Sequence, residues 1–364
     1  MGKPYATEIE NDIKDPELRD SDSPSGASPE APEFGDLDLV PEAELAQHYL
    51  THTWRTFAAS STCQVQSDSW QIFLPAQGLT CPVVRRGILV LAAMCLHHDS
   101  TADRPSGHSS KYLETAEAHG RIFVQESRQK IQKFQDSDVD SILACSRLLC
   151  VLGFAFFHIH RQNGATLADR EAWTWFQLVR GVKATWIAIV ESGKKINDIV
   201  ARDMAADPPS INLTTTSRGH RDGHRPVFDY FLRLRWERFH ALRAALRNSQ
   251  ALLDEYQSEY LGAAVDLLYE ISGHICSDEV PSLFRIVCKW PGHVSNGFVD
   301  MLMDGSPLTL AIYAHFLMSV VLVEDLWWVS DMGRAGIRDV VAMSKNAGSD
   351  IDALLRWPQH MSSL

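Results

Sequence analysis

The stretch AIYAHFLMSVVLVEDLWWVSDMG, residues 311–333, decides the fold. It is largely apolar, and it lacks the alternation of apolar and polar residues that a half-exposed strand shows. We therefore expect a buried helix from Pro307 to Trp328. The adjacent indoles of Trp327 and Trp328 predict an aromatic plug at the end of this helix, because aromatic side chains dominate the packing of helical cores.

Helical patterns continue outward from this stretch, and alternation of Val, Ile and Thr is nearly absent. Two segments interrupt them. Trp70–Pro82 contains two prolines and a glycine and predicts a loop or short turn, and residues 203–226, rich in Pro, Gly and Thr, predict the longest internal loop. Other helices are expected at 83–98, 111–134, 227–250, 256–274, 282–290, 295–303 and 333–344. The fold class that follows is all-α, with a single multi-helix domain over residues 43–360.

The acidic charge of the chain is concentrated in its first residues. The formal net charge is −12, and residues 1–42 alone hold three basic and twelve acidic side chains, a net charge of −9. This segment is poor in large apolar residues and cannot bury enough surface to offset its ordering entropy. We expect a disordered acidic tail over residues 1–42. The charge of the whole chain opposes direct binding to nucleic acid or to an anionic membrane.

The seven cysteines indicate a reducing compartment. Several lie in apolar helical runs, as buried free thiols do, none forms a Cys-x-x-Cys pair, and no secretory leader is recognised at the start. No stretch reaches about 18 uninterrupted apolar residues, so no membrane span is expected. The predicted location is cytoplasmic, or nuclear if the protein regulates transcription.

Histidines gather at two helix ends, and neither group predicts a metal site. His97, His98 and Asp99 are adjacent, and His158 and His160 alternate. Helical ligands of one ion lie one turn apart, as in His-x-x-x-His, whereas adjacent or alternate positions diverge around the helix. The motifs of a nucleophile elbow, a zinc protease and a dinucleotide-binding loop are also missing. Neither a metal ion nor a cofactor is therefore expected.

Large aromatic residues are frequent inside the expected helices. Most aromatic residues in a helical domain belong to the core, but helical folds also bind ligands between their helices. A subset is therefore predicted to line an apolar pocket for a hydrophobic small molecule. The predicted pocket residues are Phe154, Phe157, Trp175, Phe176, Trp186, Tyr313, Phe316 and Trp327.

Several blocks occur in an order that resembles a known family. They are ELAQHYLTHTWRTFA, WQIFLPAQGLTCPVVRRGILVLAAMCLHH, KYLETAEAHGRIFVQESRQKI, DSILACSRLLCVLGFAFF and, towards the end, PLTLAIYAHFLMSVVLVEDLWWVSDMGRAGIRDVV followed by LLRWP. Together they resemble the C-terminal regulatory domain of fungal zinc-cluster transcription factors of the sterol uptake control type. The resemblance covers roughly residues 43–360. It implies an all-α domain that encloses a hydrophobic pocket for ergosterol-like ligands and often dimerises, so a homodimer is one expected state.

On this resemblance the helix Tyr313–Trp328 borders the pocket, its two terminal tryptophans close the pocket's base, and His315 is a hydrogen-bonded structural residue. One departure concerns DNA. The first cysteine is Cys63, already inside the resembling domain, and acidic residues precede it. The six-cysteine zinc cluster and the basic residues that contact DNA in this family are therefore missing. The insertion His158–Trp173 is longer than the usual connection in the family and is expected to reshape the pocket.

Two functions fit a domain that has a ligand pocket and lacks the DNA-binding module. The favoured prediction is a cofactor-free cyclase of a fungal secondary-metabolite pathway, a pericyclase of the Diels–Alder type. A closed apolar pocket accelerates such a reaction by holding a flexible terpenoid or polyketide in a reactive fold. Tyr313 and His158 are the predicted catalytic residues, acting as donors that polarise a substrate carbonyl. The alternative is a ligand-sensing transcriptional regulator that relies on a partner for DNA contact.

Overall fold

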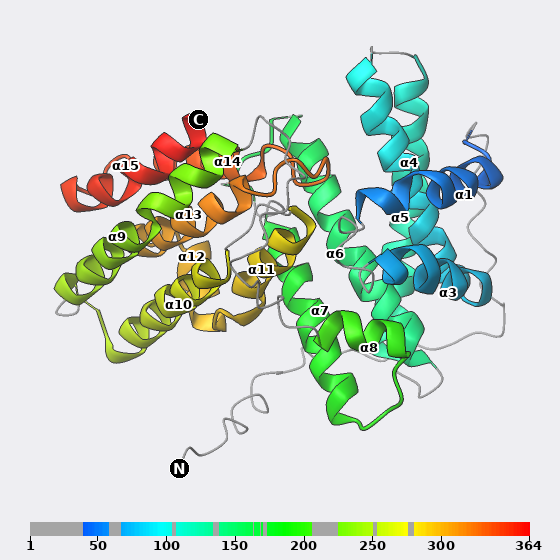
Figure 1. Ribbon diagram of the computed structural model, residues 1–364, viewed down its shortest axis with the longest axis horizontal. Helices are drawn as coiled ribbons and strands as arrows, with labels where there is room; N and C mark the ends of the chain where they lie inside the picture. Colours follow the sequence, from blue (N-terminus) through cyan, green and yellow to red (C-terminus); the bar gives the residue numbers. More distant parts are fainter. Residues whose placement is uncertain are drawn as a thin grey trace, which may run out of the picture. The chain divides into compact units, whose positions relative to one another are not determined.

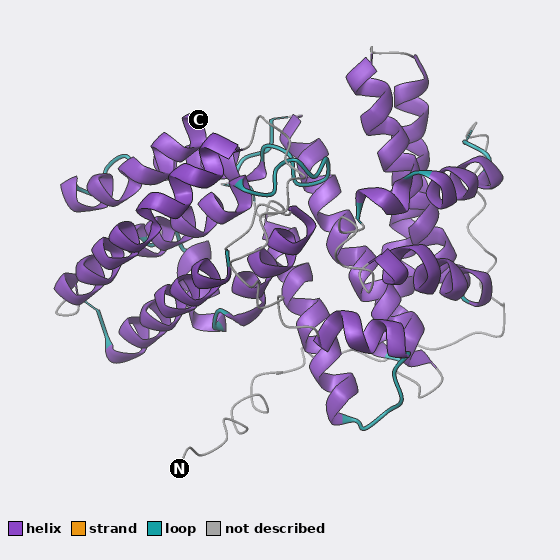
Figure 2. Ribbon diagram, in the orientation of Figure 1, coloured by secondary structure: helices purple, strands orange, loops and turns teal. Residues whose placement is uncertain are grey.

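The computed structural model describes residues 39–57, 67–103, 107–133, 138–162, 164–167, 169, 173–205, 225–249, 253–275 and 280–364. These residues contain helices and no strand, which confirms the all-α prediction for this part of the chain (Figure 2). The predicted acidic tail up to position 38 lies outside the described residues, as does most of the predicted loop 203–226. Residues 38–364 belong to one compact unit.

Fourteen α-helices and two shorter helices make up the described secondary structure (Figure 1). The shorter ones are a 3₁₀ turn, η1 (Thr53–Thr56), and a π-helical turn, η2 (Ser69–Phe73). The α-helices are α1 (Glu42–Thr51), α3 (Leu74–Thr80), α4 (Pro82–Asp103), α5 (Gly107–Gln132), α6 (Val139–Gln162), α7 (Thr174–Glu191), α8 (Asp198–Ala205), α9 (Arg225–Ser249), α10 (Glu255–His274), α11 (Val280–His293), α12 (Asn296–Met303), α13 (Pro307–Val321), α14 (Met332–Met343) and α15 (Ser349–Ser363).

Helix α13 is enclosed by other helices. Every residue from Leu308 to Val321 is buried, because α9, α10, α11, α12, α14 and α15 all pack against this helix. A helix enclosed on all sides has no polar face, which explains why the sequence of α13 is apolar around its circumference. The prediction of a buried helix here is confirmed.

The helix predicted to run to Trp328 ends at Val321, and residues 322–331 form consecutive turns. A buried carboxylate stabilises this break. Glu324 accepts a hydrogen bond of 2.9 Å from the backbone amide of Arg334, and it also pairs with the Arg334 guanidinium. The ion pair links the turns to the first residues of α14, where a negative charge is favoured by the helix dipole.

The reversal from α13 to α14 also requires a glycine. A Cβ atom at Gly333 would lie 2.6 Å from the backbone nitrogen of Val321, so a larger residue would push the two helices apart. Asp331, two residues earlier, has a left-handed backbone conformation with φ of 58°. Together these two positions fold α14 back onto α13.

The loop predicted for Trp70–Pro82 is wrong, because this segment contains η2 and α3. Pro75 lies in the first turn of α3, and Pro82 begins α4. The first amides of a helix have no intrahelical acceptor, so Pro82 removes no hydrogen bond at the start of α4. Gly78 is buried, with the Ile88 side chain 3.0 Å from the position of a Cβ atom. The two prolines that suggested a loop therefore lie in the first turns of α3 and α4, and Gly78 allows close packing against Ile88.

Helix α6 joins the N-terminal helices to α7. It packs against α4 and α5 on one side and against α7 on the other, while α1 packs on α4. Among the described residues, α6 is the one helix long and apolar enough to cross a membrane, but 83% of its most apolar window is buried inside the protein. Its apolar character is therefore explained by its place in the core.

Candidate functional site

A cavity of about 810 Å³ lies between α5, α6 and α7. Because α5 and α7 both pack against α6, α6 forms the floor of the cavity and the other two helices form its walls. The loop after α6 adds Ala165 and Asp169 to the lining. The helical lining residues are Val124, Arg128 and Ile131 of α5; Ser146, Leu149, Leu152, Gly153, Phe156, Phe157 and His160 of α6; and Thr174, Gln177, Leu178, Gly181, Val182 and Thr185 of α7.

Helix α7 presents one face to the core and another to this cavity. Trp175 and Phe176 are buried, whereas Gln177, Gly181 and Thr185 line the cavity at four-residue intervals. Residues four apart lie on one side of a helix. Apart from the neighbouring backbone of α7, no atom of the described residues lies within 4 Å of the position that a Cβ atom of Gly181 would take. The space beside the α7 wall is therefore open.

Several polar lining residues are exposed, whereas the apolar side chains of Leu149, Leu152 and Phe157 are buried. Arg128, His160 and Asp169 are exposed to solvent, so they lie where the cavity opens. Asp169 Oδ2 accepts hydrogen bonds from the amide of Thr166 at 2.7 Å and from its hydroxyl at 3.3 Å. An apolar interior with a few polar groups suits a molecule that has an apolar body and a small number of oxygen atoms.

In the segment 158–173, residues up to Gln162 end α6, and the described residues that follow lie at the cavity. Asp339 of α14 accepts a 2.9 Å hydrogen bond from the amide of Leu167, and it also pairs with Arg161. The indole nitrogen of Trp173 donates to the Leu167 carbonyl at 3.0 Å. These contacts fix the loop against α14 and against the start of α7, and so they position its contribution to the cavity.

Most of the predicted pocket residues lie in a packed aromatic cluster, and Phe157 is the member of the predicted set that lines the cavity. Trp290 stacks on Phe316 with ring centroids 4.4 Å apart. The ring of Phe154 lies 4.9 Å from that of Trp175, with the two planes tilted by 37°. The cluster also includes Trp173, Phe176 and Tyr313. Trp186, also predicted, is half-buried and packs on the core.

Tyr313 and His158, the predicted catalytic residues, have different surroundings. The Tyr313 ring is fully buried 5.2 Å from the Trp173 ring, and burial raises the pKa of its phenol far above the usual value. His158 Nδ1 is 2.8 Å from the Ser330 carbonyl oxygen, and its Nε2 is 3.1 Å from the Gln162 amide nitrogen. Burial lowers the pKa of His158. Neither side chain is among those that line the cavity.

The two consecutive tryptophans contact different parts of the chain. Trp327 is half-buried, donates from Nε1 to the Thr56 hydroxyl at 3.3 Å, and lies 5.4 Å from the His98 ring. Trp328 is buried with its ring 4.5 Å from that of Phe284. The pair thus connects η1, α4 and α11 to the turns after α13. Closure of a pocket by these indoles stays a prediction.

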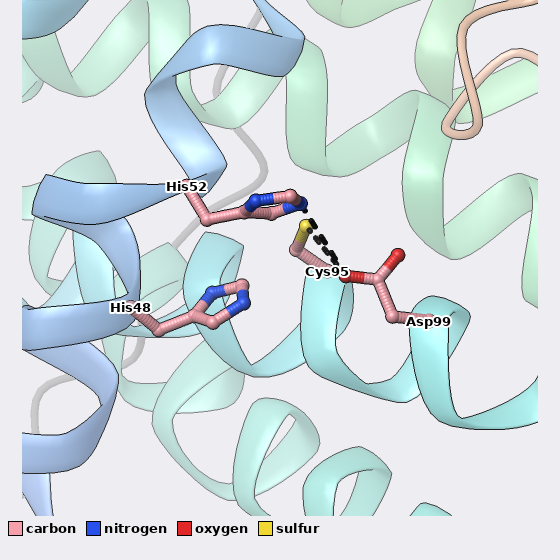
Figure 3. Close-up of side chains that lie close together, drawn as sticks. All are labelled: His48, His52, Cys95 and Asp99. Carbon is pink, nitrogen blue, oxygen red and sulfur yellow. Dashed lines mark hydrogen bonds and ion pairs between the residues drawn. The ribbon is translucent and has the colours of Figure 1, made fainter.

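Four side chains of α1, its C-terminal cap and α4 could hold a metal ion (Figure 3). They are His48, His52, Cys95 and Asp99, and their ligand atoms all lie within 4.8 Å of one another. Burial and the nearby Asp99 carboxylate raise the pKa of the Cys95 thiol to about 12.

This group was not predicted, although both of its pairs have the one-turn spacing that metal ligands on a helix require. His48 and His52 are four residues apart, as are Cys95 and Asp99. Asp99 was weighed as a ligand only together with the adjacent histidines, and no metal was expected. What the sequence does not reveal is that α1 packs on α4, which brings the two pairs together.

No family model matches this chain, and no curated protein matches it either. The resemblance to the regulatory domain of fungal zinc-cluster factors therefore stays a prediction.

Proposed function

We propose that the protein binds a hydrophobic small molecule of the terpenoid, sterol or polyketide class in the cavity between α5, α6 and α7. The observation that carries this proposal is the cavity itself. Its volume of about 810 Å³ falls within the range of about 300–1,000 Å³ that is usual for small-molecule sites. Apolar side chains such as Leu149, Leu152 and Phe157 form much of its lining, and a ligand that covers them removes apolar surface from water.

The polar lining groups favour a ligand that also carries oxygen atoms. Arg128 and Gln177 offer N–H donors from opposite walls of the cavity. A guanidinium binds a carboxylate or a polarised carbonyl more strongly than a neutral donor does. The proposed ligand therefore has an apolar skeleton and at least one carbonyl or carboxylate group.

For a ligand of this kind we also propose a cofactor-free cyclisation of the Diels–Alder type. Such a reaction forms two carbon–carbon σ bonds from π bonds of the same molecule, and no electron or proton leaves it. The protein then has to hold the reactive conformation and polarise the carbonyl that activates the alkene. Arg128 is the charged donor of the cavity. Tyr313 and His158, the donors predicted from sequence, stand outside this lining, so an Arg128→Gln variant tests the reaction in this cavity.

Binding is tested with a substitution that fills the cavity. Gly181→Trp places an indole in open space at the α7 wall, and Gly181→Ala is the matched control. We expect the affinity for anilinonaphthalene sulfonate, and for any sterol or terpenoid that raises the melting temperature, to fall at least about tenfold in Gly181→Trp. Gly181→Ala should bind as the wild type does. Equal affinities of all three proteins would contradict binding in this cavity.

The cyclase and the alternative regulator share the binding step and differ in what happens to the ligand. Purified protein without added cofactor is incubated with the linear intermediate that accumulates when the gene is deleted. A cyclase forms cyclised product faster and more stereoselectively than buffer does, and Arg128→Gln slows it. A regulator leaves the intermediate unchanged, and its deletion alters the levels of transcripts instead.

A further inference from the structure

The side chains of His48, His52, Cys95 and Asp99 form a compact group on α1 and α4 (Figure 3). Cys95 and Asp99 are four residues apart and lie on one side of α4. His48 lies in the last turn of α1, and His52 is the residue that caps the C-terminal end of this helix. Because α1 packs on α4, the two pairs face each other. The ring centroids of the two histidines are 5.2 Å apart.

The distances within this group match those between the ligands of a tetrahedral ion. His52 Nε2 lies 3.7 Å from Asp99 Oδ2, and Cys95 Sγ lies 3.8 Å from the same oxygen. Bonds of about 2.0–2.3 Å from Zn²⁺ to nitrogen, oxygen and sulfur place tetrahedral ligand atoms about 3.3–3.8 Å apart. The widest separation, 4.8 Å, closes by small side-chain rotations.

One of the histidines is already oriented for coordination. His48 Nδ1 is 2.8 Å from the hydroxyl of Thr53, which is fully buried in η1. A ring whose Nδ1 carries the proton and donates it to this hydroxyl keeps a free lone pair on Nε2. A hydrogen bond of this kind on the second nitrogen is usual for metal-bound histidine.

The burial of the group suits an ion that enters from solvent. Cys95 is fully buried, whereas the side chains of His52 and Asp99 are 54% and 45% exposed. An approaching ion therefore meets a carboxylate and an imidazole first and the thiol last.

We propose that these four side chains bind one Zn²⁺ ion that joins α1 to α4. Two imidazoles, a thiolate and a carboxylate make a mixed donor set that zinc accepts in tetrahedral geometry, whereas Mg²⁺ and Ca²⁺ require oxygen ligands. The Cys95 thiol releases its proton to solvent as its sulfur binds the ion. The hydroxyl of Thr56, the last residue of η1, accepts a hydrogen bond from Trp327 Nε1. Because His52 directly precedes η1, an ion that holds His52 also restrains η1 and its contact with the turns after α13.

The test uses Co²⁺ as a spectroscopic substitute for Zn²⁺ on the full chain, after removal of metals with a chelator. Tetrahedral Co²⁺ gives intense visible bands, and its thiolate bond gives a charge-transfer band in the near ultraviolet. We expect one Co²⁺ per chain with both features, and displacement by Zn²⁺. Cys95→Ser should lose the charge-transfer band, and Cys81→Ser, which changes a thiol outside the group, should keep it.

A second variant covers the case that Cys95→Ser, at a buried position, does not fold. His52 is exposed, so His52→Ala removes a ligand without disturbing the core. We expect its affinity for Zn²⁺ to fall at least about 100-fold, and the rise in melting temperature that Zn²⁺ gives the wild type to disappear. His293→Ala, at another exposed histidine, should match the wild type.

Two results would overturn the proposal. One is a wild-type Co²⁺ spectrum without a thiolate band. The other is equal Zn²⁺ affinity of the wild type, His52→Ala and His293→Ala, which would mean that the ion binds surface histidines non-specifically. The site uses α1 and α4, and the cavity uses α5, α6 and α7, so neither result bears on ligand binding in the cavity.

Discussion

Two regions next to α6 are rich in apolar side chains, but one is tightly packed and the other contains a cavity. Around Trp290 and Phe316, aromatic rings from α7, α11 and α13 fill the space between the helices, with centroids as close as 4.4 Å. On the side of Leu152 and Phe157, α5 and α7 leave a cavity of about 810 Å³. Helix α7 takes part in both regions, because Trp175 faces the cluster and Gly181 faces the cavity.

The difference shows that large aromatic residues need not mark a binding pocket. Rings of Trp and Phe that contact one another leave little room for a ligand, and their contacts stabilise the fold. The cavity instead lies beside residues with small or branched side chains, such as Gly153, Gly181 and Val182. The cluster is therefore expected to determine stability, and the cavity to determine binding.

The largest effect is expected for Trp290→Ala in the cluster. Trp290 is fully buried against Phe316 and donates a hydrogen bond of 2.9 Å to the Ala264 carbonyl. Its loss leaves a large internal void and should lower the free energy of unfolding by about 3–5 kcal/mol, measured by urea denaturation. Trp186→Ala, at a half-buried position, is the control and should cost less. If Trp290→Ala weakens probe binding more than Gly181→Trp does, the assignment of stability to the cluster and of binding to the cavity is wrong.

The second largest effect is expected to be a loss of stability in acid that comes from a buried histidine of α13. His315 is buried in α13 near Phe239 and Trp357, and burial lowers its pKa from 6.5 to about 4. As the pH falls below about 6.5, the unfolded chain takes up a proton that the folded protein does not. Stability from this group is therefore complete above pH 6.5 and is lost towards pH 4, by up to about 1.4 kcal/mol per pH unit.

This pH dependence is measured by urea denaturation between pH 7 and pH 4.5. His315→Leu should flatten the curve, because Leu fits the apolar site and has no proton to gain. Ser319→Ala, at another buried position of α13, changes no titrating group and is the control, so it should retain the wild-type slope. An unchanged slope in His315→Leu would assign the acid sensitivity to other groups.

Helices were easier to predict from the sequence than the sites between them. The buried helix at α13 was predicted because its residues are apolar on every side, whereas α3 was missed because Pro75 and Gly78 are typical of loops. The cavity could not be predicted, since its position depends on how far apart α5 and α7 lie on α6. The same holds for His48 and Cys95, whose proximity depends on the packing of α1 on α4.

A smaller effect is expected for Gly153→Ala in the floor of the cavity. A Cβ atom here would lie 2.5 Å from Cδ1 of Leu178, and this flexible side chain can turn into the cavity. We expect probe affinity to fall by about tenfold or less, with little change in stability, since alanine favours the helix by about 1 kcal/mol. Gly262→Ala in α10, where the nearest atom is 4.0 Å away, should leave binding unchanged. Equal binding by both variants would mean that Leu178 does not border the occupied space.

The smallest effect is expected for Gly181→Ala at the α7 wall. The position is inside a helix, and among the described residues only the neighbouring backbone of α7 comes within 4 Å of the added methyl group. Alanine reduces the freedom of the unfolded chain, so the free energy of unfolding should rise by about 0.5–1 kcal/mol in urea denaturation. Probe affinity should not change, because one methyl group takes up little of a cavity of about 810 Å³. A loss of stability would mean that this wall is packed like the aromatic cluster, and the contrast between the two regions would then not hold.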